Sequence, residues 1–189
     1  MNSLRNHVTN AHLSSLFSTW RRIARIVAVL AGGGILAAWV SAQETLRSDM
    51  VVYGATPGGV MAATAAARAG QSVLVLEPGN HVGGVVSGGL VETDIGDRRT
   101  VGGLAAEFFQ RVKEHYRRTY GEDSKQFARC RDGLMYEPHV AERVMDQMLA
   151  ECRGVTVMKG QRMTGVQRDS RGIGALEIED LRAKVRRRV

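Results

Sequence analysis

The sequence predicts an α/β fold built on a parallel β-α-β unit, and three observations carry this prediction. A short apolar run over residues 50–53 leads into the glycine-rich turn 54–59, which reads GATPGG. An alanine-rich stretch follows and predicts a helix that ends at Gly70. A second apolar run, 73–76, then ends at the carboxylate of Glu77, as expected for the neighbouring parallel strand.

The spacing within this stretch predicts a dinucleotide site. Gly54 permits a tight turn, and Gly59 lets the helix begin close to the strand. Ala63 and Ala67 keep the helix face against the sheet thin. Free backbone N–H groups at the helix start suit a pyrophosphate, and Glu77, 23 residues after Gly54, suits the ribose hydroxyls. A crossover that uses its small residues only for packing is the alternative.

One position departs from the G-x-G-x-x-G pattern, because Thr56 stands where the middle glycine is expected. A side chain there crowds a pyrophosphate unless its hydroxyl turns to hydrogen-bond it, although Gly58 beside Gly59 restores room. A nicotinamide-dependent dehydrogenase is the weaker alternative, since both Thr56 and the glycine run within 81–90 argue against it.

After Glu77 the chain reads PGNHVGG over residues 78–84 and VVSGGL over residues 85–90. Together with GATPGG and VLVLEP, these phrases resemble the N-terminal part of FAD-dependent oxidoreductases of the glutathione-reductase type. The resemblance is to an exported bacterial group whose glycine turn reads GATPGG, in which Thr56 is the ordinary residue. It implies a Rossmann-like FAD-binding domain with parallel strands, followed by a β-hairpin or meander, and FAD as the cofactor.

The resemblance also implies roles for particular residues. Gly83 and Gly84 are expected against the FAD pyrophosphate, and Ser87 is expected to lead toward the flavin. No residue is predicted as a catalytic acid or base. The predicted cofactor-binding residues are Gly54, Thr56, Pro57, Gly58, Gly59, Glu77, Gly83, Gly84 and Ser87.

Other polar residues invite a functional interpretation, but the packing interpretation is favoured for each. For His81, a solvent-facing loop histidine is expected, and a covalent or catalytic role beside the flavin is the alternative. For Glu137 and His139, helix capping and packing are expected over a place at the active site. Cys130 and Cys152 form no C-x-x-C pair, so no metal site is predicted, while a single disulfide stays open for an exported domain.

The rest of the chain predicts two more helices and a hairpin. Residues 102–120 predict an amphipathic helix, and residues 121–133 predict a loop. Another helix is predicted to begin near Pro138, with Met145 and Met148 in the core. Short alternating runs then predict a parallel strand followed by a hairpin, at 155–158, 163–167 and 173–178.

Residues 1–42 predict a signal peptide. Arg21, Arg22 and Arg25 precede the apolar run 26–40, and small residues follow up to Ala42. Because the apolar run is shorter than the roughly 20 residues that span a bilayer, cleavage is expected, and an uncleaved anchor is the alternative. The arginine pair also suggests twin-arginine export, although an ordinary basic leader is slightly favoured. The predicted location is periplasmic or extracellular.

The charge distribution argues against a specific nucleic-acid partner. The formal net charge is +7, but residues 1–42 carry four arginines and no acid, and residues 181–189 carry five basic groups. The middle of the chain is therefore nearly balanced. The expected partners are FAD and an unidentified small-molecule substrate, with a membrane contact only through an uncleaved leader.

The predicted organisation is a leader at 1–42, a partial FAD-binding Rossmann-like domain at 43–180 and a basic tail at 181–189. The predicted function is the dinucleotide-binding part of an FAD-dependent oxidoreductase, in which the flavin performs hydride transfer. The resemblance implies a later glycine turn and a substrate domain that these residues do not contain. A truncated, non-catalytic nucleotide-binding remnant or assembly module is therefore the principal alternative.

Overall fold

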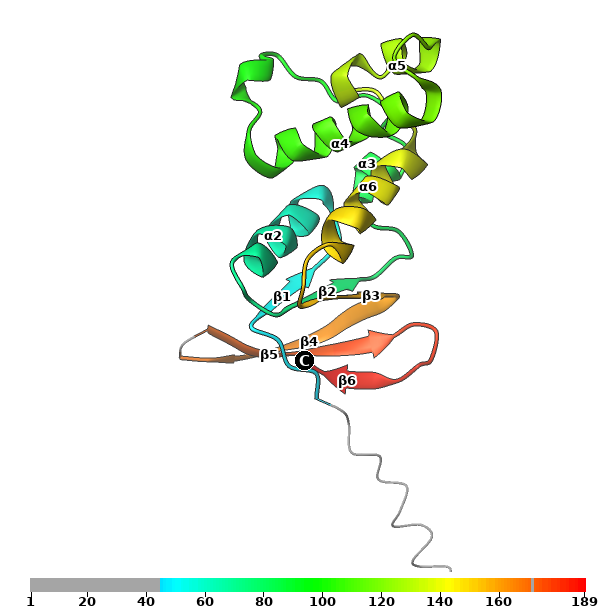
Figure 1. Ribbon diagram of the computed structural model, residues 1–189. Coiled ribbons are helices and arrows are strands. Elements are labelled where there is room, and N and C mark those ends of the chain that lie inside the picture. Colours follow the sequence, from blue (N-terminus) through cyan, green and yellow to red (C-terminus); the bar gives the residue numbers. More distant parts are fainter. Residues whose placement is uncertain (1–44, 171) are drawn as a thin grey trace, which may run out of the picture. The chain divides into compact units, whose positions relative to one another are not determined.

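The computed structural model describes residues 45–170 and 172–189, which belong to one unit, Gln43–Val189. The predicted signal peptide lies outside the described residues. A parallel sheet occupies the middle of this unit, between a layer of helices and an antiparallel sheet (Figure 1). The three-layer arrangement agrees with the predicted α/β fold and its C-terminal hairpin.

The parallel sheet has the strand order β1-β2-β3. Its strands are β1 (Met50–Tyr53), β2 (Val73–Glu77) and β3 (Val155–Lys159). The central strand β2 is buried along its apolar length, as expected for a strand covered on both faces. The predicted β-α-β unit and third parallel strand are therefore confirmed.

Helix α2 (Pro57–Arg68) connects β1 to β2. Its N-cap residue is Thr56, and Pro57 occupies the first helical position. Gly70, with φ of +88°, lies just beyond its last turn. The glycine turn before α2 and the end of α2 near Gly70 are therefore local features that the sequence predicts well.

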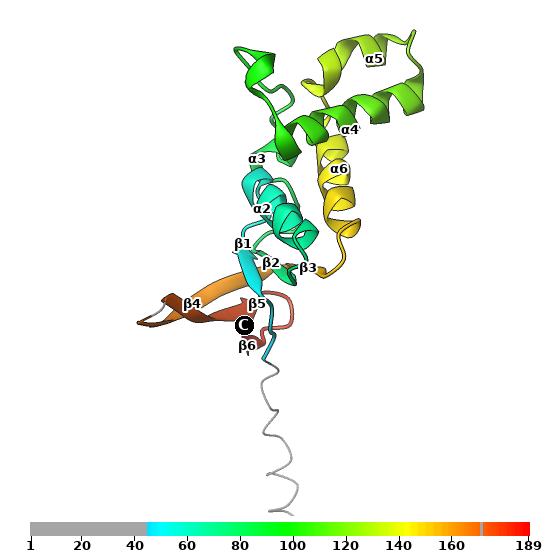
Figure 2. The ribbon, with the colours of Figure 1, turned by 60° about the vertical axis from the view of Figure 1, so that its left-hand side comes forward.

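Helices α4 (Gly103–Tyr120) and α6 (Pro138–Ala150) complete the helical side, with α4 farther from the sheet than α2 (Figures 1 and 2). The short helix α3 (Gly84–Ser87) and the 3₁₀ turn η1 (Arg98–Thr100) lie between β2 and α4 in the chain. The core on this side of the sheet joins all three long helices. It includes Val60, Val75, Val82, Phe108, Val112, Tyr116, Val144, Met145 and Met148.

The loop prediction for residues 121–133 is wrong, because the segment forms α5 (Lys125–Arg129) and the 3₁₀ turn η2 (Arg131–Gly133). Ser124 caps α5 by accepting a hydrogen bond from the Phe127 N–H group at 3.1 Å. Gly133 has φ of +88° and packs so closely on α4 that a Cβ atom there would lie 2.0 Å from the Phe109 carbonyl oxygen. Both cysteines, Cys130 and Cys152, are free thiols.

The antiparallel sheet has the order β4-β5-β6 and packs its apolar residues Leu176 and Ile178 against Leu74 and Leu76 of β2. Strands β4 (Gln161–Asp169) and β5 (Gly172–Asp180) form the predicted hairpin.

The segment 181–189, predicted as a basic tail, contains the strand β6 (Arg186–Arg188). Two of its three arginines lie opposite acidic residues of β5, with Arg188 paired to Glu177 and Arg186 to Glu179. Charge complementarity across the strands explains why so basic a segment extends the sheet.

Within the described part of the chain, no helix is both long and apolar enough to cross a membrane.

Candidate dinucleotide site

The glycine turn 54–59 lies at the C-terminal end of β1, beside the end of β2. The Gly54 N–H group donates to the Leu76 carbonyl oxygen at 2.7 Å, and Gly54 has φ of +97°, which favours glycine. A Cβ atom on Gly59 would lie 2.1 Å from the Gly54 carbonyl oxygen. The strand and α2 therefore approach so closely that only glycine fits at Gly59, as the spacing argument predicts.

The start of α2 presents unpaired donors. Thr56 turns its hydroxyl toward the helix and accepts a hydrogen bond from the Gly59 N–H group at 3.2 Å. Pro57 has no N–H group, and the Gly58 N–H group has no hydrogen-bond partner among the residues described. The Thr56 hydroxyl proton is also free to be donated, so its side chain does not simply obstruct an anion at this positive helix end.

Glu77 lies at the end of β2 and joins two loops. One carboxylate oxygen accepts the Ala55 N–H group at 2.7 Å, and the other accepts the Gly79 N–H group at 2.6 Å. Each oxygen keeps a further lone pair that could accept a ribose hydroxyl. The sequence predicted the ribose role only, and the structure adds an anchoring role that positions the glycine turn.

The second glycine segment contacts the first. The Gly83 N–H group donates to the Ala55 carbonyl oxygen at 2.6 Å. A Cβ atom on Gly84 would lie 3.5 Å from Thr56 Cα, so the two backbones are neighbours. Ser87 closes α3 by donating to the Gly84 carbonyl oxygen at 3.3 Å. The structure thus brings together the predicted residues of both glycine segments.

The other predicted candidates have different surroundings. The His81 side chain is 75% exposed, and its Nδ1 atom lies 3.0 Å from a carboxylate oxygen of Glu142. Glu137 is the N-cap residue of α6, but its side chain makes no capping hydrogen bond. His139 is exposed in the first turn of α6. Among the described residues, no three His, Cys, Asp or Glu side chains form a potential metal site.

Sequence spacing did not reveal Glu142. Its carboxylate also accepts the Val82 N–H group at 3.0 Å. Burial acts to raise the pKa of Glu142, but hydrogen bonds from His81 and Val82 hold this pKa below its ordinary value. Because Glu142 lies 60 residues after Val82 in the chain, no local motif could have indicated this contact.

A second loop contact was also missed. The Asn80 side-chain oxygen accepts a hydrogen bond from Arg182 at 2.6 Å. Asp180 holds the backbone of this segment by accepting the Ala183 N–H group at 2.8 Å. Together with a hydrogen bond from Gln161, this backbone contact lowers the pKa of Asp180 to about 2.

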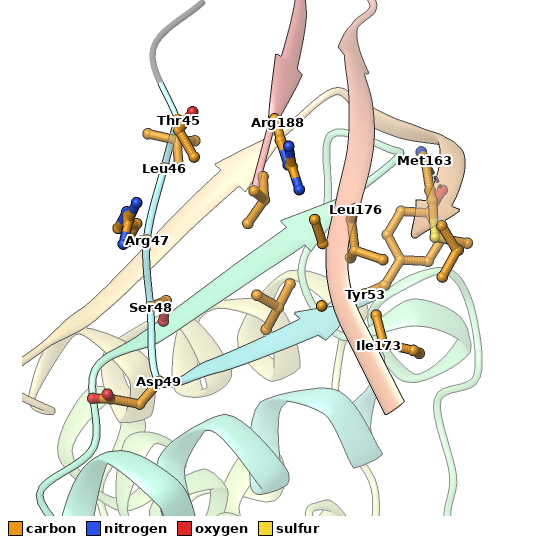
Figure 3. Close-up of a pocket in the computed structure, with 15 residues that line it drawn as sticks. Thr45, Leu46, Arg47, Ser48, Asp49, Tyr53, Met163, Ile173, Leu176 and Arg188 are labelled. Atoms are coloured by element: carbon orange, nitrogen blue, oxygen red, sulfur yellow. Dashed lines mark hydrogen bonds between the residues drawn. The ribbon is translucent and has the colours of Figure 1, made fainter. Parts of the chain in front are cut away.

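A hollow with a volume of about 870 Å³ lies elsewhere, between the segment 45–49, β1 and the antiparallel sheet. Figure 3 shows Tyr53, Met163, Ile173 and Leu176 along it. The Tyr53 hydroxyl accepts the Met163 N–H group at 3.1 Å. None of the predicted cofactor-binding residues lines this groove.

Residues 49–189 match the family of FAD dependent oxidoreductases. The match covers well over half of the chain, which therefore belongs to this family, and its cofactor is FAD. The family membership favours FAD over the nicotinamide alternative.

Individual relatives match this chain either over a short segment or over a longer one at low sequence identity. Thiamine thiazole synthase of Aeropyrum pernix is 48% identical over 44 residues, which are 23% of this chain and 16% of the synthase. The solved structure of Thermovibrio ammonificans THI4 is 17% identical with a TM-score of 0.47, over 82% of this chain and 57% of that one. The solved structure of a 3-ketosteroid-delta4-(5alpha)-dehydrogenase of Rhodococcus jostii RHA1 is 18% identical with a TM-score of 0.47. The match covers 81% of this chain and 45% of the dehydrogenase chain. The chain thus spans less than two thirds of each.

The described residues fit the ADP half of FAD. The start of α2 presents the Gly58 N–H group, and the adjoining segment presents the Gly84 N–H group, also without a partner in the described chain. Both glycines are exposed, so an anion can reach them. Two unpaired donors beside a helix N-terminus suit a pyrophosphate, and the adjacent Glu77 carboxylate suits a ribose.

Proposed function

We propose that this chain provides the ADP-binding part of an FAD-dependent oxidoreductase of the glutathione-reductase type. In this proposal the pyrophosphate binds to the turn 54–59 and to Gly83 and Gly84, and the ribose binds to Glu77. Ser87 lies on the path toward the flavin. When FAD is bound, its flavin supplies hydride transfer to or from a small substrate, while the residues of this chain hold and orient the cofactor.

The observation that carries the proposal is the junction between the two glycine segments. Gly83 is 29 residues after Gly54 in the chain, yet its N–H group binds the Ala55 carbonyl oxygen at 2.6 Å. A βαβ crossover that used glycine only for packing needs Gly59, but it does not need a second glycine segment that presents the exposed Gly84 amide beside the first. A bound pyrophosphate accounts for both segments at once.

Ligand competition on the full chain tests the assignment. We expect FAD to bind in a calorimetric titration, ADP to compete with it, and FMN not to compete. This pattern follows from the proposal, in which the described residues hold the ADP half of FAD. Tight binding of NAD with no affinity for FAD would contradict the proposal, as would competition by FMN but not by ADP.

We also propose that the chain is exported, on the strength of its leader sequence. The order of a basic region, an apolar run and small residues before Gln43 supports this location. A non-catalytic nucleotide-binding module is the alternative to an enzyme. Turnover by the FAD-loaded chain alone would decide against that alternative.

A further inference from the structure

The loop 78–83, between β2 and α3, is held by several elements of the fold. It presents the second glycine segment to the first, so its position determines where the exposed Gly84 amide lies. Several contacts from outside the loop fix it. They include Gly160 N–H to Gly79 O at 2.9 Å, Arg182 to Asn80 at 2.6 Å, Val82 N–H to Glu142 at 3.0 Å, and Gly83 N–H to Ala55 O at 2.6 Å.

Of these contacts, that of Glu142 joins Val82, the residue directly before the glycine pair, to helix α6. Glu142 lies within α6, with its side chain only 21% exposed. One carboxylate oxygen accepts the Val82 N–H group, and the other contacts His81 Nδ1, both at 3.0 Å. The Lys159 ammonium group, 3.6 Å away, partly balances the carboxylate charge. A carboxylate held at both oxygens has a fixed orientation.

The same face of α6 shapes the next peptide of the loop. Met145 follows Glu142 by three residues, and a Cβ atom on Gly83 would lie 3.0 Å from the Met145 sulfur. The Val82 side chain is fully buried in the core. The loop is therefore held against α6 at Val82 and Gly83, and the Gly83 N–H group donates to the Ala55 carbonyl oxygen.

We propose that Glu142 is a positioning residue for the FAD pyrophosphate. It acts through Val82 and Gly83, by fixing the second glycine segment against the first, and it needs no contact with the cofactor. This inference rests on the proposed function, because it assumes that the pyrophosphate lies on both glycine segments. It predicts that the placement of the carboxylate, and not its charge, controls FAD affinity.

Two substitutions of Glu142 separate placement from charge. Glu142→Gln keeps an oxygen acceptor at the same reach for the Val82 N–H group but removes the charge. Glu142→Asp keeps the charge but is one carbon–carbon bond too short to keep the contact. We expect Glu142→Asp to raise the Kd for FAD about 10-fold, the size expected for one lost backbone hydrogen bond. We expect Glu142→Gln to bind within about 2-fold of the unaltered chain.

The matched control is Asp146→Ala. Asp146 lies one turn after Glu142 on α6 and also approaches Lys159, at 3.9 Å, but among the described residues it has no hydrogen bond or ion pair with the loop. We expect this variant to keep the FAD affinity of the unaltered chain. Hydrogen exchange of the FAD-free chains gives a second readout, in which the Val82 and Gly83 amides exchange faster in Glu142→Asp than in Glu142→Gln.

Each outcome decides the inference. Unchanged FAD affinity in Glu142→Asp overturns it, as does equal weakening by Glu142→Gln or by Asp146→Ala. If Glu142→Asp does not fold, His81→Ala removes one of the two partners of the carboxylate from an exposed site, and we expect about 3-fold weaker binding. Wild-type affinity in that variant then overturns the inference. If the unaltered chain itself binds no FAD, the proposed function fails, and the inference fails with it.

Discussion

The substitution Gly58→Asp should stabilise the fold and weaken FAD binding at the same time. Gly58 is exposed in the first turn of α2, where no acidic residue is present. It has room for a side chain, because the nearest atom to an added Cβ is the Thr56 hydroxyl oxygen at 4.0 Å. A carboxylate there interacts favourably with the helix dipole, which we expect to raise the free energy of unfolding by about 0.5 kcal/mol.

The same carboxylate would occupy the proposed pyrophosphate position. Two unit charges about 4 Å apart interact by about 4 kcal/mol at the effective dielectric constant of a protein surface. Exposure to solvent reduces this repulsion, so we expect a loss of about 2 kcal/mol in binding, or about 30-fold in the Kd for FAD. Calorimetry measures the Kd, and urea unfolding measures the stability.

Two matched variants isolate the charge at this site. Gly58→Ala adds bulk without charge, and we expect the Kd for FAD to change less than about 3-fold. Gly102→Asp places the same carboxylate at the N-cap of α4, where nothing lies within 4 Å of an added Cβ and no side chain caps the helix. It should stabilise the fold and leave FAD binding unchanged. A folded Gly58→Asp variant that binds FAD as tightly as the unaltered chain would refute the reasoning.

Three further outcomes follow from the sequence and structure. Gly133→Ala should lower the free energy of unfolding by about 3 kcal/mol in urea, because the added Cβ atom would meet the Phe109 carbonyl oxygen at 2.0 Å. The hydrogen bond from Arg68 lowers the pKa of Glu107 to about 2 from 4.5, so the stability it contributes is complete above pH 4.5 and is lost as the pH falls toward 2. Glu107→Gln should therefore lose less stability on acidification than the unaltered chain. Mass spectrometry of exported protein should find Gln43 as the first residue.

The controls for these outcomes are specific. Gly96→Ala, where nothing lies within 4 Å of the added Cβ, should change stability little. Equal loss of stability in Gly96→Ala and Gly133→Ala would argue against the close approach to α4 as the cause. Identical acid sensitivity with and without Glu107 would rule out its pairing with Arg68 as a source of pH dependence. An exported chain that retains residues 1–42 would support the anchor alternative.

Local sequence signals predicted the β-α-β unit because its physical requirements are local. The turn at Gly54, the close approach at Gly59 and the carboxylate at Glu77 lie within one supersecondary unit, at spacings set by backbone geometry. The helix beginning at Pro138 was predicted for the same reason. The roles of these residues in FAD binding remain predictions.

Long-range contacts were not predictable in this way. The helices within 121–133 depend on close packing between Gly133 and α4, and the strand β6 depends on acidic partners in β5. Similarly, Glu142 contacts a loop 60 residues earlier in the chain. A single sequence contains no periodicity or motif that reports such pairings, because they arise only when the elements pack.

The most direct test of the central claim is an NMR titration of the glycine-labelled full chain with FAD. If the pyrophosphate lies between the two glycine segments, the amide signals of Gly58 and Gly84 should shift together at the same FAD concentration. Gly174, which lines the groove beside the antiparallel sheet, should not shift. Shifts at Gly174 with none at Gly58 and Gly84 would place FAD in the groove and contradict the account.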